Sequence, residues 1–240
     1  MLLTTQNLAI GYNAQKVIFN DISLSAGSGD MIALLGINGI GKSTLLKTLI
    51  GIQKPISGLI QIDNINIHTL SIAQRSKYIS VVLTDKIDID SISVKEFIAL
   101  GRSPYTDWFG QITEQDNQKI EESIHLLGIE KLANKYYNHL SDGEKQKVAI
   151  ARAISQDTPL VVLDEPTAFL DFRSKKMLLQ LLKSICIATQ KIIILSTHDV
   201  EATYSYCNNW WLMKENKQFE QLTTACNYQK QIADKMFLEG

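Results

Sequence analysis

A glycine-rich loop constrains the fold of this chain more than any other stretch of its sequence. The loop comprises Gly36, Ile37, Asn38, Gly39, Ile40, Gly41, Lys42, Ser43 and Thr44, with the spacing G-x-x-x-x-G-K-[ST]. The apolar run 31–35 ahead of it is typical of a buried strand, and residues 43–50 behind it have the spacing of a short helix. A strand that leads through such a loop into a helix is the setting that this pattern requires. The stretch therefore predicts an α/β fold.

The loop also predicts binding of a nucleoside triphosphate. Glycine lacks a Cβ atom, so several backbone N–H groups can point at phosphate oxygens and φ can be positive. Lys42 would reach the β- and γ-phosphates, Ser43 would ligate Mg²⁺, and the helix would direct its positive end at the anion. The alternative is a chance match on a flexible turn, which we expect in roughly one chain of this length in a hundred. The flanking strand and helix favour phosphate binding.

Composition indicates a chain that is folded throughout and carries no surplus of positive charge. Of its 240 residues, 45% are hydrophobic and 20% are charged, as in ordinary globular proteins. Lys and Arg number 24 against 25 Asp and Glu, so the formal net charge is −1. Proteins that bind nucleic acid usually carry a basic excess to neutralise phosphates. We therefore expect no nucleic-acid partner.

The cysteines and the apolar runs bear on the compartment. Cys186, Cys207 and Cys226 are widely spaced and form no C-x-x-C, so neither a disulfide framework nor a zinc site is indicated. A reducing cytoplasm suits this pattern. The first residues lack the features of a signal peptide, and no apolar run is long enough to span a bilayer. Any attachment to a membrane is thus expected to come through a partner.

Apolar patterning predicts a core interrupted by a helical lobe. The first thirty residues alternate like antiparallel strands. The β-branched run 78–83 is expected to be a central strand, after which helical spacing dominates as far as residue 155. We expect the core at 1–85 and 156–240 and the lobe at 86–155. Further predicted elements are strands at 59–63, 160–163 and 191–196, helices at 71–77 and 173–188, and a hairpin at 210–222.

Three polar side chains follow predicted strands directly. Asp164 and Glu165 come after the run 160–163, and His198 comes after the run 191–196. Strand ends in α/β sheets present such groups to a ligand, and phosphoryl transfer needs a metal carboxylate, a water-activating group and a γ-phosphate contact. An isolated Asp-Glu pair or histidine is more often structural. Because all three follow strands expected beside one cradle, we predict these roles for Asp164, Glu165 and His198, in that order.

A helix is predicted to begin within residues 140–146. Ser141 is placed as its N-cap with Glu144 three residues later, which is a capping box and explains both side chains locally. A capped helix N-terminus is also an anion site, because its free N–H groups and its dipole attract negative charge. The spacing alone leaves both interpretations open.

Together these motifs resemble the ATP-binding subunit of an ABC transporter over essentially the whole chain. In that family a Walker A loop is followed by a Q-loop, an L-S-G-G-Q signature, a Walker B strand, a D-loop and a switch histidine. The matching positions are 36–44, the region of Thr84, 140–144, 160–165, Ala168 with Phe169, Leu170 and Asp171, and His198. Tyr12 falls at the aromatic that stacks on adenine. The resemblance implies an ABC-type P-loop fold with an N-terminal antiparallel β subdomain, and ATP and Mg²⁺ as cofactors.

The resemblance further implies a homodimer. In the family the signature acts in trans, so two copies enclose two ATP molecules head to tail. Ser141, Gly143 and Glu144 of one copy, with Asp171, would then face nucleotide held by the other. The chain departs from the family pattern at several positions, which are Thr84 for the Q-loop glutamine, Asp142 and Glu144 in the signature, and Ile37 and Ile40 in the cradle. The first puts Thr84 in doubt as a metal-site residue, and the acidic changes imply weaker ATP-driven closure of the dimer.

The lobe indicates a transporter subtype. Residues 99–110 resemble the stretch found in importers of iron-siderophores, haem and cobalamin, and they include Trp108 and Phe109. These rings would either dock onto a membrane subunit or fill the small core of the lobe. The resemblance implies two permease subunits, an indirect link to a substrate-binding protein, and a peripheral position on the cytoplasmic face of the cell membrane.

Two other functions remain to be weighed. A soluble ABC-type ATPase, for example in iron-sulfur assembly or mechanical work on nucleic acid, is disfavoured by the near-neutral charge and by the Trp108 loop. A small-molecule kinase on the same cradle would lack the signature segment 140–144. Phosphate transfer to an acceptor other than water would indicate the kinase.

Overall fold

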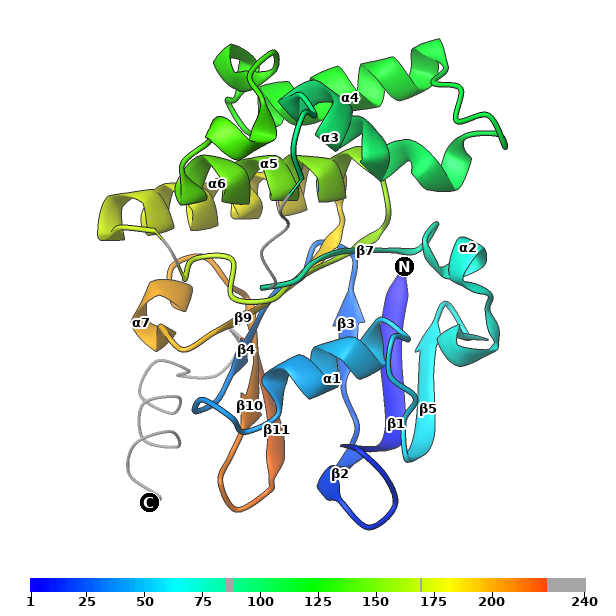
Figure 1. The fold of residues 1–240 in the computed structure, drawn as a ribbon. Helices are drawn as coiled ribbons and strands as arrows, with labels where there is room; N and C mark the ends of the chain where they lie inside the picture. Colours follow the sequence, from blue (N-terminus) through cyan, green and yellow to red (C-terminus); the bar gives the residue numbers. More distant parts are fainter. Residues whose placement is uncertain (85–88, 169, 224–240) are drawn as a thin grey trace.

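The computed structural model describes residues 1–84, 89–168 and 170–223. Asp85, Phe169 and Cys226 lie outside the described residues, as does the predicted junction between core and lobe at 85 and 86. Figure 1 shows the helical lobe stacked on one side of a twisted sheet, with the chain's first strands on the other side. None of the helices in the described ranges combines the length and apolar character needed to cross a bilayer.

The main sheet has six strands in the order β11-β10-β4-β9-β8-β7. All neighbouring strands are parallel except β10 and β11, which form an antiparallel hairpin. The predicted hairpin at 210–222 and the predicted strands at 160–163 and 191–196 are therefore confirmed. The strands are β4 (Met31–Leu35), β7 (Ile79–Val82), β8 (Leu160–Leu163), β9 (Ile192–Thr197), β10 (Asn209–Met213) and β11 (Phe219–Thr223). Because β4, β9, β8 and β7 run in the same direction, their carboxyl ends meet at one edge of the sheet.

The prediction that 78–83 forms a central strand is wrong. Strand β7 pairs with β8 only and ends the sheet on that side among the described strands. Ile79 and Val82 are nevertheless buried, and helix α5 (Asp142–Ser155) packs against this strand. A run of β-branched residues indicates that the two faces of a strand are buried. It does not indicate whether the strand has a hydrogen-bonded neighbour on one side or on both.

A second, antiparallel sheet precedes the cradle, as predicted. Its order is β2-β1-β5-β6, with β3 paired to β1. Its strands are β1 (Leu2–Gly11), β2 (Val17–Ile22), β3 (Ser25–Gly27), β5 (Ser57–Ile62) and β6 (Ile65–Asn66). Strand β5 thus joins the first strands after the chain has passed through the cradle and helix α1 (Lys42–Leu49).

Alternating side chains divide the core into two clusters. Along β4, Met31 and Ala33 pack with the helical side, whereas Ile32 and Leu34 pack with α1 and the antiparallel sheet. Both faces of the parallel sheet are therefore covered, which explains why its strands are almost continuously apolar. The other helices are α2 (Ile72–Arg75), α3 (Val94–Ala99), α4 (Glu114–Leu126), α6 (Phe172–Thr189) and α7 (Val200–Thr203). Short 3-10 helices cover Ile67–Thr69, Leu100–Tyr105, Glu130–Leu132 and Tyr137–His139.

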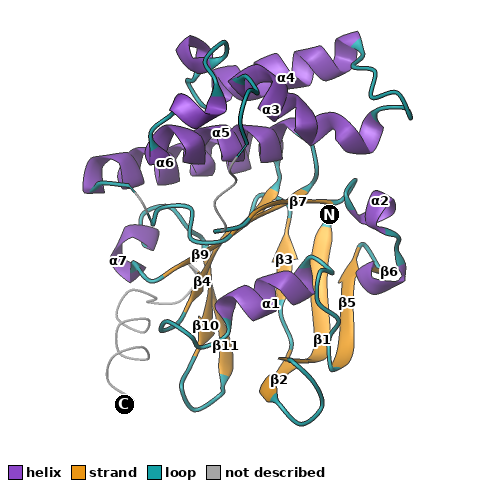
Figure 2. Cartoon of the chain, viewed as in Figure 1, coloured by secondary structure: helices purple, strands orange, loops and turns teal. Residues whose placement is uncertain are grey.

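Helices α3, α4 and α5 form the lobe and lie together above the sheet (Figure 2). Each begins at a capping box, with Ser93, Thr113 and Ser141 as the N-caps. Val94 and Ile120 of the lobe belong to the same apolar cluster as the sheet. The lobe therefore has no separate core among the described residues, although the division of the chain at 86–155 stays a prediction.

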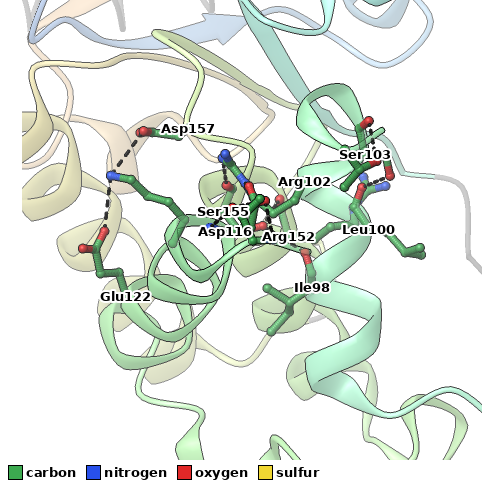
Figure 3. Close-up of polar contacts among 12 residues, drawn as sticks. Ile98, Leu100, Arg102, Ser103, Asp116, Glu122, Arg152, Ser155 and Asp157 are labelled. Atoms are coloured by element: carbon green, nitrogen blue, oxygen red, sulfur yellow. Dashed lines mark hydrogen bonds and ion pairs between the residues drawn. The ribbon is translucent and has the colours of Figure 1, made fainter. Parts of the chain in front are cut away.

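A buried ion pair ties the lobe together. Arg102 Nε donates to Asp116 Oδ1 at 2.8 Å, and Arg102 Nη1 donates to the Ser155 carbonyl at 2.8 Å. Both charged side chains are buried, and Figure 3 shows Arg102 between α4 and the end of α5. Thr113 donates its hydroxyl to Asp116 at 2.6 Å, and this bond is the main reason why the pKa of Asp116 lies below its ordinary value. Arg102 thus anchors the segment before the Trp108 loop at two points, one at α4 and one at the end of α5.

Candidate active site

The predicted strand-end residues are brought together by the register of the parallel sheet. Leu35 of β4 pairs with Thr197 of β9, and Leu163 of β8 pairs with both Leu195 of β9 and Val82 of β7. The residues that follow these pairs leave the sheet at one edge. They are Gly36 after β4, His198 after β9 and Asp164 after β8, with Thr84 one residue further on after β7. Segments far apart in the sequence thus meet beside the glycine loop, as their positions after predicted strands led us to expect.

The cradle has the backbone that its glycines predict. Gly39 and Gly41 have φ values of 79° and 118°, in the left-handed region that side chains with a Cβ rarely adopt. At Gly41 an added Cβ would also lie 2.9 Å from Ile18 Cγ2 of strand β2. The antiparallel sheet therefore presses directly against the cradle, and only glycine leaves room for it.

Lys42 opens helix α1 and turns back into the loop. Its Nζ donates to the carbonyl oxygens of Gly36 at 2.7 Å and Ile37 at 3.1 Å. Burial lowers the pKa of Lys42, while the nearby charges of Glu165 and Asp164 act in the opposite direction. The ammonium therefore lies within electrostatic reach of both carboxylates, inside the loop that would hold phosphates.

Asp164 and Glu165 are held by a residue that the sequence analysis did not single out. Ser196 Oγ donates to Asp164 Oδ1 at 2.6 Å and accepts from the Glu165 N–H at 2.8 Å. Glu165 has a φ of 49°, in the left-handed region. The only sequence signal was a hydroxyl that follows the apolar run 192–195, two positions before His198.

The oxygen groups here suit a magnesium ion bound together with phosphates. Mg²⁺ prefers one or two carboxylates plus substrate phosphates and water, rather than a cage of protein ligands. In the described ranges, no group of three or more His, Cys, Asp or Glu side chains is positioned to hold a metal. Asp164 is buried, and Oδ2 of its carboxylate makes no hydrogen bond within the described residues. This donor set fits Asp164 and Ser43 as protein ligands and nucleotide phosphates as the others.

Thr84 lies at the end of the neighbouring strand, where the family has its Q-loop. Its hydroxyl is 3.4 Å from the carbonyl oxygen of Asp164, to which it donates. The side chain therefore contacts the backbone at the end of β8, the strand that Asp164 follows. Its predicted, and doubtful, role at the metal stays a prediction.

His198 follows β9 and its side chain is exposed. The backbone after it is ordered by Thr197, whose Oγ1 accepts from the Asp199 N–H at 3.0 Å. Asp199 in turn caps α7 and lies 3.6 Å from Lys175 Nζ. These contacts position the turn and leave the imidazole at the same edge as the cradle.

The signature residues line a separate cavity of about 640 Å³. Ser141, Gly143, Glu144 and Asp171 all border it, and no residue of the cradle 36–44 does. The capping box is confirmed, since Ser141 N donates to Glu144 Oε2 at 2.9 Å and Glu144 N donates to Ser141 Oγ at 3.3 Å. Hydrogen bonds from Ser141 hold the pKa of Glu144 below its ordinary value. The structure thus assembles two polar clusters, one at the strand ends and one at this cavity.

Two further predicted residues are placed as follows. Asp171 is the N-cap of α6 and accepts from Ser174 N at 3.0 Å. Tyr12 lies in the β1–β2 turn, 65% exposed, with Lys16 Nζ 5.0 Å from its ring centroid. Strand β2 of the same hairpin contacts Gly41, so the exposed ring is carried by an element that touches the cradle.

Comparison with known proteins identifies the family. A family model described as ABC transporter matches residues 19–168, which is more than half of the chain. The chain belongs to the ABC transporter family. It is an ATP-binding subunit of that family, an ATPase, and the assignment by resemblance is confirmed.

The names of similar proteins agree with this family assignment. An uncharacterized ABC transporter ATP-binding protein of Methanocaldococcus jannaschii is 37% identical over 90% of the chain and 74% of the relative. The achromobactin transport ATP-binding protein of Dickeya dadantii is 33% identical over 91% of the chain and 81% of the relative. A dimeric structure of a bacterial ABC transporter cassette is 25% identical, with a TM-score of 0.78, over 92% of the chain and 98% of that cassette.

The aromatic loop of the ATPase is exposed. Trp108 is 97% exposed and Phe109 is 85% exposed. Asp107 orders the turn, because its Oδ1 accepts from the N–H groups of Phe109 and Gln111, each at 3.0 Å. The alternative that these rings fill the core of the lobe is therefore wrong. Docking onto a partner stays a prediction.

Proposed function

We propose that this ATPase hydrolyses ATP as a homodimer and powers import of an iron-siderophore, haem or cobalamin. The observation that carries the hydrolytic part is the meeting of the cradle, Asp164, Glu165 and His198 at the ends of adjacent parallel strands. The relative named as an achromobactin transport ATP-binding protein supports a role in transport.

The proposed chemistry follows from the groups at the strand ends. The backbone N–H groups of the cradle and Lys42 bind the phosphates, and Glu165 accepts a proton from the attacking water. As oxygen of that water bonds to the γ-phosphorus, the bond to the β,γ-bridging oxygen breaks, which leaves ADP and phosphate. His198 contacts the γ-phosphate. Bound Mg²⁺, held by Ser43 and Asp164, would neutralise charge on the phosphate oxygens.

The homodimer is supported by the separation of the two polar clusters. Ser141, Gly143, Glu144 and Asp171 line a surface cavity that no cradle residue borders, and in the proposed dimer a second copy supplies them to bound nucleotide. The similarity to a dimeric cassette agrees with this arrangement. The N-terminus of α5, through its helix dipole, then offers an anion site to the γ-phosphate held by the partner copy.

The proposed membrane partners are two permease subunits, with a substrate-binding protein acting through them. The support is the exposed Trp108 and Phe109, since aromatic rings with this exposure are typical anchors of an interface. The subunit would then lie peripherally at the cytoplasmic face. The near-neutral charge again disfavours nucleic acid as a partner.

The test is ATP turnover by the purified chain, followed by reconstitution with an importer permease from the same organism. We expect phosphate release that depends on Mg²⁺, and stimulation once the permease and a loaded binding protein are present in liposomes. Transfer of phosphate to an acceptor other than water would contradict the hydrolytic proposal. Full ATPase activity without any association with a permease would favour the soluble ABC-type alternative.

A further inference from the structure

Ser196 connects the two carboxylate residues of the proposed site. It lies in β9, with 0% of its surface exposed, and it pairs with Leu34 of β4. Its hydroxyl lies 2.6 Å from Asp164 Oδ1 and 2.8 Å from the backbone nitrogen of Glu165. One buried atom is thus shared by the residue proposed to hold the metal and the residue proposed to accept the proton.

The direction of both hydrogen bonds is fixed by chemistry. A hydroxyl has a single hydrogen, an ionised carboxylate can only accept, and a backbone N–H can only donate. The Ser196 hydrogen therefore points at Asp164, and a Ser196 lone pair receives the Glu165 N–H. A bond of this length to a carboxylate is charge-assisted and among the stronger hydrogen bonds in proteins.

The Ser196 hydroxyl also takes the place of a backbone acceptor at the point where β8 leaves the sheet. The last paired residues of β8 and β9 are Leu163 and Leu195. On the β7 side the backbone continues to pair, since Asp164 N donates to the Val82 carbonyl at 2.8 Å. On the β9 side the Glu165 N–H has left the ladder and is satisfied by the Ser196 side chain. That bond steadies a peptide whose residue has a φ of 49°.

We infer that Ser196 is a positioning residue for hydrolysis, which orients the Asp164 carboxylate toward the cation and the Glu165 backbone toward the attacking water. This inference rests on the proposed roles of Asp164 and Glu165. Because Ser196 is fully buried, it would act only through Asp164 and Glu165. With Oδ1 tied to Ser196, Asp164 presents Oδ2 to the site in a fixed direction.

The test compares Ser196→Thr with Ser196→Val. The two side chains have nearly the same shape, so any strain from the added methyl groups is common to both, and only threonine keeps the hydroxyl. Ser196→Ala adds no volume and serves if the larger residues prevent folding. Ser80→Ala is the matched control, because Ser80 is also a buried strand serine but its Oγ has no partner among the described residues.

Three quantities are measured in the purified ATPase. We expect kcat for Ser196→Val and Ser196→Ala to be at least about tenfold below that for Ser196→Thr, with little change in KM, since misplaced groups act on the transition state. The Mg²⁺ concentration that half-saturates binding of a non-hydrolysable ATP analogue should rise several-fold. Hydrogen exchange at the Glu165 amide should accelerate in the variants without a hydroxyl and stay slow in Ser80→Ala.

The outcomes separate the inference from its premise. If Asp164→Ala and Glu165→Gln keep the parental rate, the site itself is wrong. If those two variants are inactive but Ser196→Thr and Ser196→Val agree within about twofold in kcat and Mg²⁺ dependence, the role of Ser196 is overturned. A loss in Ser196→Val that only follows a smaller folded fraction, with unchanged Mg²⁺ dependence, would likewise overturn it.

Discussion

The strand-end site and the signature cavity hold their polar groups in different ways. At the strand ends, Lys42 and Asp164 are each 6% exposed and Ser196 is fully buried. Ser196 of β9 bonds to Asp164 at the end of β8, and Lys42 of α1 bonds back to the loop that follows β4. At the cavity, Ser141 bonds to Glu144 and Asp171 bonds to Ser174, each three residues along the chain. The first cluster is completed by the fold of one chain. The second is an exposed, locally built surface that leaves room for a partner, which is what a shared nucleotide site requires.

Glu165→Gln should produce the largest effect on the strand-end site. The amide keeps the shape and the backbone bond to Ser196 but cannot accept the proton, so hydrolysis should fall by about 10²–10⁴-fold. ATP binding should be preserved, and ATP-bound dimers should accumulate. Phosphate release and size-exclusion chromatography with ATP measure the two effects. Turnover within about tenfold of the parent would rule out a general-base role.

Lys42→Ala should weaken nucleotide binding itself. It removes a charge-assisted hydrogen bond to the β- and γ-phosphates, which is worth about 1.5–3 kcal/mol and predicts a loss of ATP affinity of about tenfold to a hundredfold. Lys47→Ala, in the last turn of the same helix, is the control and should bind normally. Calorimetry with ATP gives both affinities. Equal affinity for the parent and Lys42→Ala would contradict the proposed contact.

The lobe offers a buried ion pair with no chemical role. Asp116→Asn leaves Arg102 buried without its carboxylate, so the free energy of unfolding should fall by about 3 kcal/mol. The exposed Lys95–Glu121 pair is the control, since Glu121→Gln should cost less than about 1 kcal/mol. Denaturant unfolding measures both. The rate of ATP hydrolysis per folded molecule should stay at the parental value.

Asp116→Asn should also change how the free energy of unfolding depends on pH. The pKa of Asp116 is lowered in the folded state, chiefly by the Thr113 hydroxyl and also by Arg102. Its contribution to stability is therefore present above the pKa of the unfolded chain and is lost as the pH falls toward the folded value. Asp116→Asn should lose less stability than the parent on acidification below about pH 4. Parallel acid-unfolding curves would show that Asp116 contributes nothing.

Thr84→Ala should have a small effect on hydrolysis. The threonine is shorter than the glutamine usual in the family and donates to the backbone of Asp164, so a bridging water would have to complete any contact with the metal site. We expect a loss of less than about tenfold, far below that of Asp164→Ala. Equal losses in the two variants would make Thr84 a direct ligand.

The double change of Trp108 and Phe109 to Ala should leave the isolated ATPase unchanged in both turnover and melting temperature. Both rings are exposed, so their removal costs no packing. Association with the permease should be lost if they are interface anchors. Trp210 and Trp211 are 0% exposed, so a blue shift of tryptophan emission on adding permease would report on Trp108. A lower melting temperature in the isolated variant would indicate that the two rings pack within the subunit.

The sequence by itself determined everything that depends on local spacing. The cradle and the capping box at Ser141 follow from which residue types can adopt positive φ or cap a helix three residues away. The apolar runs likewise determined that 31–35 and 160–163 are buried strands. Spacing also placed Asp164 and His198 directly after strands, because a strand end is visible as the point where an apolar run stops.

Only the tertiary structure decided which strand ends meet and what holds them. The edge position of β7 and the pairing of Leu163 with Leu195 depend on which strands share hydrogen bonds, and hydrophobic pattern carries no record of partners. Ser196 lies 32 residues from Asp164 in sequence and contacts it only through that pairing. The exposure of Trp108 was undecided for the same reason, because an aromatic ring suits a core and an interface equally well until its neighbours are known.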